Sequence, residues 1–213
     1  MALAALTLLA MLHAPAAQEA RDHVTGRFDY YVLALSWSPS WCMLKGDERN
    51  APECRDGAGL GFVLHGLWPQ YEAGWPSDCR TDLPDPRRRQ NAAQTDLFRS
   101  AGLAWHQWKK HGRCSGLTAD AYFALSRRAF AAIDRPWVFK QLSAGIWIAP
   151  AAVEAAFLEA NPSIPPSGIT ITCRNAVLHE VKICLTRELA FRACGLDTRV
   201  DCRLNPVYFP KMR

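Results

Sequence analysis

Several features are absent from the sequence. It contains no low-complexity tract, no internal repeat and no CxxC pair among its eight cysteines. The first two absences argue against a disordered chain and a repeat protein. The third, together with irregular cysteine spacing, disfavours a zinc site. The apolar stretch near the N-terminus has only about a dozen residues, which is too few to span a bilayer.

The composition is that of a globular protein. The 213 residues are 49% hydrophobic and 21% charged, which is sufficient for one domain with a substantial core. The formal net charge of +5 favours a polyanionic partner. The eight tryptophans supply core side chains, and their ring faces can also stack nucleobases.

Residues 1–17 are expected to form a signal peptide, although they lack the usual positively charged n-region. The small residues at the end of this segment predict cleavage after Ala16 or Ala17. Residues 18–213 would then form a single exported domain, periplasmic or secreted, without a membrane segment. The even number of cysteines agrees, because it suits a disulfide framework in an oxidising compartment.

The most informative segment is 105–114, Trp-His-Gln-Trp-Lys-Lys-His-Gly-Arg-Cys. At about 100° per residue on a helix, four of its polar side chains fall within roughly 140° of one face. These are His106, Gln107, Lys110 and His111. Trp105 and Trp108 fall on the other side, where they can anchor the helix in a core. The pattern predicts an active-site helix for an anionic substrate.

A second segment, 62–70, supplies a further histidine. Its first residues, Phe-Val-Leu, indicate a buried strand, and His65 is the only ionisable group in this apolar run. Gly66 and Pro69 are expected to break the strand, which would leave His65 at its end. Functional sites are often built on such strand ends and the turns after them.

These two segments resemble the ribonuclease T2 family. Its first active-site motif, His-Gly-Leu-Trp-Pro, is present as residues 65–69. Its second, His-Glu-Trp-x-Lys-His-Gly-Thr-Cys, is present as residues 106–114 with two changes, Gln107 for Glu and Arg113 for Thr. The resemblance extends over residues 27–203.

The resemblance implies an α+β fold, with a largely antiparallel central sheet flanked by helices and stapled by disulfides. The residue pattern agrees, because it favours strands at both ends of the chain and helices in the middle. Thr118 suits a helix N-cap. Strands are expected at 28–36, 59–65, 169–173 and 177–184, and helices at 91–101, 104–112, 118–133 and 150–160.

The resemblance also implies how the cysteines pair. The pairs would be Cys42–Cys54, Cys79–Cys114, Cys173–Cys202 and Cys184–Cys194, the last nested inside the third. Each bridge would contribute about 2–4 kcal/mol of stability. One of them would tie the segment after the first motif to the end of the active-site helix.

The family's mechanism implies a catalytic role for five side chains. His111 would be the general base and His65 the general acid, since imidazoles titrate near neutrality. His106 would hold the phosphate, and Lys110 and Gln107 would stabilise the transition state.

Three further residues are expected to bind substrate. Trp68, at the family's base-binding position, would stack a nucleobase, and Tyr71 would lie beside it. Because a ring face stacks on any base, this implies low base specificity. Arg113 adds a positive charge that would help to hold phosphate.

The expected protein is therefore a monomeric, exported ribonuclease for single-stranded RNA that leaves 2′,3′-cyclic phosphates and uses neither cofactor nor metal. Two alternatives stay open. One is a ribonuclease-fold RNA-binding protein whose catalysis is weakened or lost through Gln107. The other is a zinc hydrolase that uses His65, His106 and His111.

We predict that Gln107→Glu raises the cleavage rate. A carboxylate would place negative charge beside a protonated histidine, and charge-assisted hydrogen bonds are roughly twice as strong as neutral ones. Steady-state cleavage of a short RNA by the two proteins measures the effect. An unchanged or lower rate would show that the site has adapted to the amide.

Overall fold

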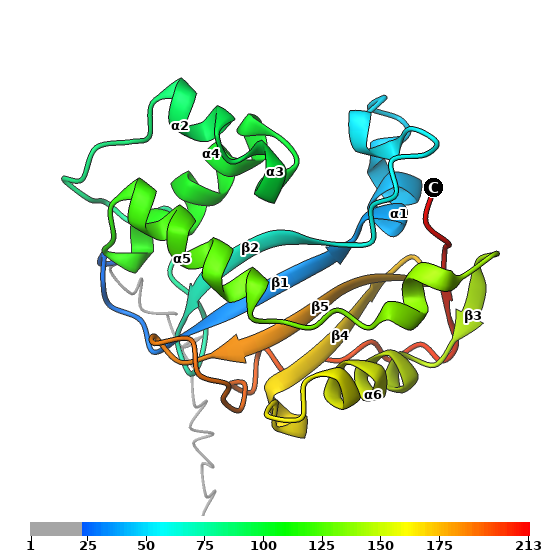
Figure 1. Cartoon of the computed structure of the whole chain (residues 1–213). Helices are drawn as coiled ribbons and strands as arrows, with labels where there is room; N and C mark the ends of the chain where they lie inside the picture. The colour runs from blue at the N-terminus through cyan, green and yellow to red at the C-terminus, as the bar shows by residue number, and fades with distance from the viewer. Residues whose placement is uncertain (1–22) are drawn as a thin grey trace, which may run out of the picture.

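The computed structural model describes residues 23–213, and they are organised around one six-stranded sheet (Figure 1). The strand order is β2-β1-β5-β6-β3, and β4 pairs with β5. The pairs in this sheet are antiparallel except for one parallel pairing between β5 and β6. The strands are β1 (Tyr30–Trp37), β2 (Phe62–Gln70), β3 (Ile146–Ile148), β4 (Ile169–Arg174), β5 (Val177–Leu185) and β6 (Val207–Phe209).

The helices gather in two places. Figure 1 shows α2, α3 and α4 beside the β2 edge of the sheet, with α5 crossing in front of it and α6 beside β4. The α-helices are α1 (Ser38–Trp41), α2 (Arg88–Ala92), α3 (Thr95–Phe98), α4 (Ala101–Lys110), α5 (Ala119–Ala131) and α6 (Pro150–Ala160). Short 3₁₀ or π turns are η1 (Cys42–Gly46), η2 (Pro52–Cys54), η3 (Gly112–Ser115), η4 (Trp137–Gln141) and η5 (Pro166–Gly168).

The side chains of the central strand β1 point alternately into the main core and to the second face of the sheet. All eight of its residues are buried, and successive side chains point to opposite faces. One set joins side chains of α5 and α6 in the main core: Tyr31, Leu33, Leu35 and Trp37. The other set comprises Tyr30, Val32 and two small residues, Ala34 and Ser36. This second face carries the site described below.

The α+β fold with a largely antiparallel sheet is confirmed, and so are several of its elements. Helix α6 spans the expected residues 150–160. Thr118 caps α5, and its hydroxyl accepts a hydrogen bond from Ala121 N at 3.3 Å. Strands β4 and β5 lie within one residue of their expected bounds.

Other expectations were wrong. The helix expected at 91–101 is two short helices, α2 and α3, and α3 ends at Arg99 in a left-handed conformation (φ 64°). Strand β2 does not stop at His65 but continues to Gln70. It lies at the sheet edge, where Pro69 is tolerated because no partner needs its missing N–H. Strands β3 and β6 have three residues each, too few to produce a recognisable alternation.

Four disulfide bonds connect the elements. They are Cys42–Cys54, Cys79–Cys114, Cys173–Cys202 and Cys184–Cys194, the same pairs that the family resemblance implies. The second of these joins the segment that follows β2 to η3, directly after α4. It therefore holds the two motif-bearing elements together.

The expected signal peptide, residues 1–17, lies outside the described residues. Within residues 23–213, none of the helices combines the length and apolar character needed to cross a bilayer.

Candidate active site

A β-bulge places His65 on the second face of the sheet. Ala34 of β1 pairs with Gly66 of β2, but the next residue, Leu35, pairs with Leu64. His65 is therefore the extra residue of the bulge, and it lies within β2 and not at its end as expected. Bulges are over-represented beside active sites because they redirect a side chain.

Helix α4 and the residue after it bring four more predicted side chains to this place. The helix was expected at 104–112 but runs from Ala101 to Lys110. His106 and Lys110 are exposed, whereas Gln107 is only 1% exposed. His111 follows the helix with φ −122° and ψ −46°. Its position is thus set by the chain leaving the helix, not by helical spacing.

One cavity of about 330 Å³ is lined by all five predicted catalytic side chains and by Trp68. The catalytic set is His65, His106, Gln107, Lys110 and His111. Such a volume lies at the lower end of the range for ligand pockets. The structure thus brings together two motifs that lie about forty residues apart in the sequence.

The electrostatic environment keeps His111 neutral. Burial, followed by the positive charges of Lys110, His65 and His106, lowers the pKa of His111 to about 3. Its Nδ1 atom is buried without a hydrogen-bond partner among the described residues. At neutral pH this ring is therefore uncharged and able to accept a proton.

Trp68 contacts several of the other side chains that line the cavity. Its ring centroid lies 5.2 Å from that of His65, edge-on, and 5.1 Å from that of His111, nearly stacked. Its Nε1–H donates to Oε1 of Gln107 at 2.8 Å. Lys182 Nζ lies 5.6 Å from the same ring. One indole thus contacts both proposed proton-transfer residues, and the buried amide fixes it.

Gly66 is required for the close approach of β2 and α4. A Cβ atom at this position would lie 2.2 Å from both Gln107 Oε1 and Trp68 Nε1, the two atoms of that hydrogen bond. No side chain fits there unless this bond breaks. The glycine of the first motif therefore has a packing role.

Of the predicted substrate-binding residues, Trp68 lines the cavity but Tyr71 does not. Tyr71 is half-buried and packs against the main core. The side chain that lines the cavity instead is Trp75, which is 57% exposed. Both aromatic residues lie in the loop after β2, and the sequence of this loop does not indicate which of them lines the cavity.

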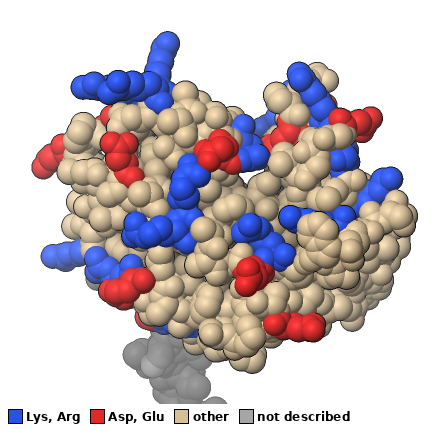
Figure 2. Space-filling view, in the orientation of Figure 1, with Lys and Arg blue, Asp and Glu red and all other residues tan. Residues whose placement is uncertain are grey.

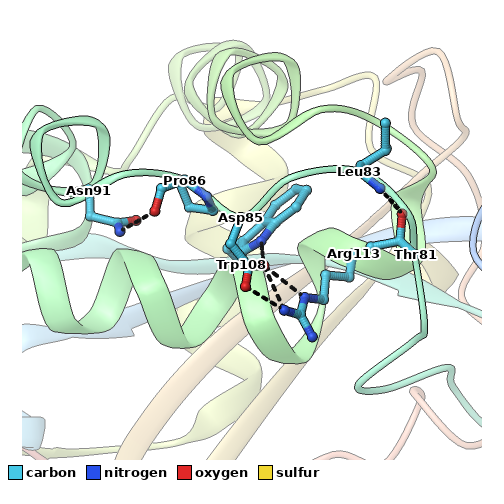
Figure 3. Close-up of polar contacts among 7 residues, drawn as sticks. All are labelled: Thr81, Leu83, Asp85, Pro86, Asn91, Trp108 and Arg113. Carbon is cyan, nitrogen blue, oxygen red and sulfur yellow. Dashed lines mark hydrogen bonds and ion pairs between the residues drawn. The ribbon is translucent and has the colours of Figure 1, made fainter.

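Arg113 is also placed apart from the cavity. Its guanidinium binds Asp85 through two nitrogens, with Nη2 at 2.6 Å from Oδ1 and 2.7 Å from Oδ2 (Figure 3). Trp108 Nε1–H also donates to Asp85 Oδ1, at 2.9 Å. The expectation that Arg113 holds phosphate is therefore corrected, because its charge binds the loop before α2 to η3, the turn that follows the active-site helix.

Sequence reasoning missed the contribution of β5. Glu180 is 5% exposed and contacts His65, and Lys182 lines the cavity. Alternation around Val181 and Ile183 was the available signal, since it puts Glu180 and Lys182 on one face of the strand. Asp197 and Thr198 also line the cavity, and no sequence pattern marks them.

A second cleft of about 550 Å³ borders His65 on its other side. Its walls carry Lys45, Arg49, Arg99 and Arg174, with Glu53 as the acidic residue among them. In Figure 2 it lies between the helices at upper left and the α1 segment at upper right, where lysine and arginine side chains are seen. The charge of this surface suits a polyanion.

No three His, Cys, Asp or Glu side chains within residues 23–213 are grouped so that they could hold a metal ion. All eight cysteines form disulfides. The three histidines of the zinc alternative line one cavity but do not form such a group.

The chain is similar to known ribonucleases in sequence and to solved structures in fold. A ribonuclease of Aeromonas hydrophila is 45% identical over 124 residues, covering 57% of this chain and 54% of that protein, so the match spans about half of its length. Ribonuclease I of Escherichia coli is 29% identical over 231 residues, covering 88% of this chain and 85% of that protein. An RNase-related protein from Calystegia sepium superposes with a TM-score of 0.69 at 18% identity, covering 88% and 99% of the two chains, which shows the fold.

The sequence model of the Ribonuclease T2 family matches residues 28–194. The chain belongs to the ribonuclease T2 family. Within this family's second motif, its two departures have different consequences. Gln107 lies in the cavity and holds Trp68, whereas Arg113 binds Asp85 outside it.

We predict that Gly66→Ala impairs both stability and site geometry. Overpacking costs typically about 1–3 kcal/mol, and here it must separate Trp68 from Gln107. The melting temperature should fall by several degrees, and any RNA-cleaving activity by at least about tenfold. The matched control is Gly102→Ala at an exposed position of α4, where the nearest atom is 3.9 Å away. Equal behaviour of the two variants would contradict this role of Gly66.

We predict that Arg113→Thr lowers the melting temperature by a few degrees, because it removes the bidentate ion pair between η3 and the loop before α2. Since Arg113 lies outside the cavity, cleavage well below the melting temperature should stay within about twofold of the wild-type rate. Calorimetry and initial rates measure the two effects. A large rise in KM for RNA at unchanged stability would restore Arg113 as a phosphate ligand.

Proposed function

We propose that this protein is an exported, metal-independent endoribonuclease that cleaves single-stranded RNA by transphosphorylation. The observation that carries the proposal is the pair of imidazoles in one cavity, His111 kept neutral and His65 hydrogen-bonded to a buried carboxylate. One can accept a proton while the other donates one, which is what general acid–base catalysis requires.

The reaction begins at the RNA's own 2′-hydroxyl. His111 takes its proton, and the 2′-oxygen forms a bond to phosphorus while the bond from phosphorus to the 5′-oxygen breaks. His65 donates a proton to that departing oxygen. The products are a 2′,3′-cyclic phosphate and a 5′-hydroxyl, so atoms and protons balance without a cofactor.

The other side chains of the cavity stabilise the charge that develops on phosphate. His106, Lys110 and Lys182 surround it with donors, and Gln107 contributes its amide N–H groups because its carbonyl is used by Trp68. Binding of an anion also offsets the positive charges that lower the pKa of His111. The substrate thereby makes this base stronger.

Base binding would use the two cavity tryptophans. The Trp68 ring is nearly stacked on His111. Trp75 is largely exposed and lines the same cavity. Stacking on such rings contributes about 1–3 kcal/mol per base and tolerates every base. This supports single-stranded RNA as the substrate with low base specificity.

The basic cleft beyond His65 suits the leaving strand. The acid that protonates the 5′-oxygen must lie beside the nucleotide that departs, and this cleft borders the same histidine. The four disulfides support export, because such bonds persist in oxidising compartments.

An RNA-binding protein with little catalysis is the second candidate. It is favoured by two observations: Gln107 replaces the family's carboxylate, and a pKa of about 3 makes His111 a weak base in the free protein. The persistence of both proton-transfer histidines and Lys110 favours the enzyme.

We expect the purified protein to cleave a short RNA in excess EDTA and to leave a 2′,3′-cyclic phosphate, identified by mass. His65→Ala and His111→Ala should each reduce the rate by about 10²–10⁴-fold. Cleavage that requires added zinc would favour the metal alternative. Binding without cleavage would favour the RNA-binding protein.

Two controls make this test specific. Each variant should keep the wild-type melting temperature to within a few degrees, which separates lost chemistry from lost folding. The exposed His23, which lies outside the cavity, provides a matched His→Ala control that should retain the full rate. Near-normal turnover by either active-site variant would refute the assigned roles.

A further inference from the structure

Glu180 is a buried carboxylate in direct contact with the proposed general acid. Its side chain is 6% exposed, and Oε1 accepts a hydrogen bond from Nδ1 of His65. The other oxygen, Oε2, lies 3.8 Å from Nδ1 of His179. Because Nδ1 of His65 is engaged, Nε2 is the nitrogen that remains for the substrate.

The two side chains meet across the central strand. His65 projects from the bulge in β2, and Glu180 lies on β5, on the opposite side of β1. Between them β1 contributes Ala34, paired with both Gly66 and Lys182, and Ser36, paired with both Val63 and Glu180. Both β1 residues are small, so the imidazole and the carboxylate can reach over the strand.

The carboxylate is ionised. Burial opposes its ionisation, but the hydrogen bond from His65 and the positive charges of His65, His179 and Lys182 hold the pKa of Glu180 below its usual value. A negative charge next to an imidazole favours the protonated ring. A general acid has to carry that proton before it can donate it.

We propose that Glu180 is a positioning residue for His65: it accepts the Nδ1–H bond and orients the ring with Nε2 toward the leaving 5′-oxygen. The inference rests on the proposed function. It adds a carboxylate on β5 to the two motifs that carry the catalytic histidines.

Most other titratable groups around His65 are basic, although His111 is neutral at pH 7. From α4 and its end come His106, Lys110 and His111, and from β5 come His179 and Lys182. The second cleft adds Lys45, Arg49, Arg99 and Arg174. Two further carboxylates line these cavities, but Glu53 accepts from Ser38 and Asp197 accepts from Gly74 N. Glu180 is therefore the carboxylate that offsets this positive charge at His65.

The decisive variant is Glu180→Gln, which keeps the size and an acceptor oxygen but removes the charge. Near neutral pH we expect kcat for a short RNA to fall about 10–100-fold with little change in KM. Because the removed charge lies next to the proposed acid, the alkaline limb of the kcat profile should move toward acid in this variant.

A second readout does not depend on activity. Ring nitrogen NMR of the wild-type protein, with His65 assigned by its loss in His65→Ala, should show the Nδ1–H tautomer in the neutral ring. In Glu180→Gln the ring nitrogen shifts of His65 should differ from those of the wild type. The wild-type measurement stands even if the variant fails to fold.

Glu154→Gln is the matched control. Glu154 is a half-buried glutamate on α6 that lines neither cavity, so its neutralisation should leave the pH profile and the His65 signals unchanged. Glu180→Asp keeps the charge on a shorter side chain. It should lower kcat through misplacement while moving the alkaline limb less than Glu180→Gln does.

The outcomes separate this inference from the proposed function. If Glu180→Gln lowers kcat equally at all pH values, or leaves it unchanged, the positioning role is wrong although the enzyme stands. A wild-type His65 with its proton on Nε2 would also overturn it. If the wild-type protein cleaves no RNA, the proposed function fails, and the NMR measurement of the His65 tautomer still decides whether Glu180 holds the ring.

Discussion

The site depends on the antiparallel pairing of β1 with β2 on one side and β5 on the other. This register brings the bulged His65 opposite Glu180 and Lys182, across the small residues Ala34 and Ser36. The alternate residues of the same strand fill the main core, so the sheet cannot slip by one residue without burying polar groups. The stability of the core and the geometry of the site are therefore both set by the register of β1 with its two neighbours.

The second constraint is the contact between β2 and α4. Gly66 allows the two elements to approach until Trp68 donates to Gln107, and the Cys79–Cys114 disulfide holds the segments that follow them. The amide at position 107 keeps the hydrogen-bond geometry that a carboxylate would have, but it adds no negative charge to a cavity rich in cations. The buried carboxylate that contacts His65 is Glu180 on β5.

Much of the fold followed from residue patterns. The apolar run of β1, the alternation in β4 and β5 and the long helices α5 and α6 were strong signals. The elements α2, α3, β3 and β6 were too short to produce any. The five catalytic candidates came from two contiguous motifs and do line one cavity. Arg113 and Tyr71 were misplaced because adjacency in sequence does not say which way a side chain turns outside regular structure.

The sequence by itself determined the residue types, the fold class and the membership of two motifs in one family, because local periodicity and contiguous motifs survive without tertiary contacts. Only the tertiary structure decided that Glu180 meets His65, that Trp75 and not Tyr71 enters the cavity, and that Arg113 binds Asp85. Each of these depends on strand register or loop path. Such long-range geometry joins residues far apart in the chain, and no local pattern encodes it.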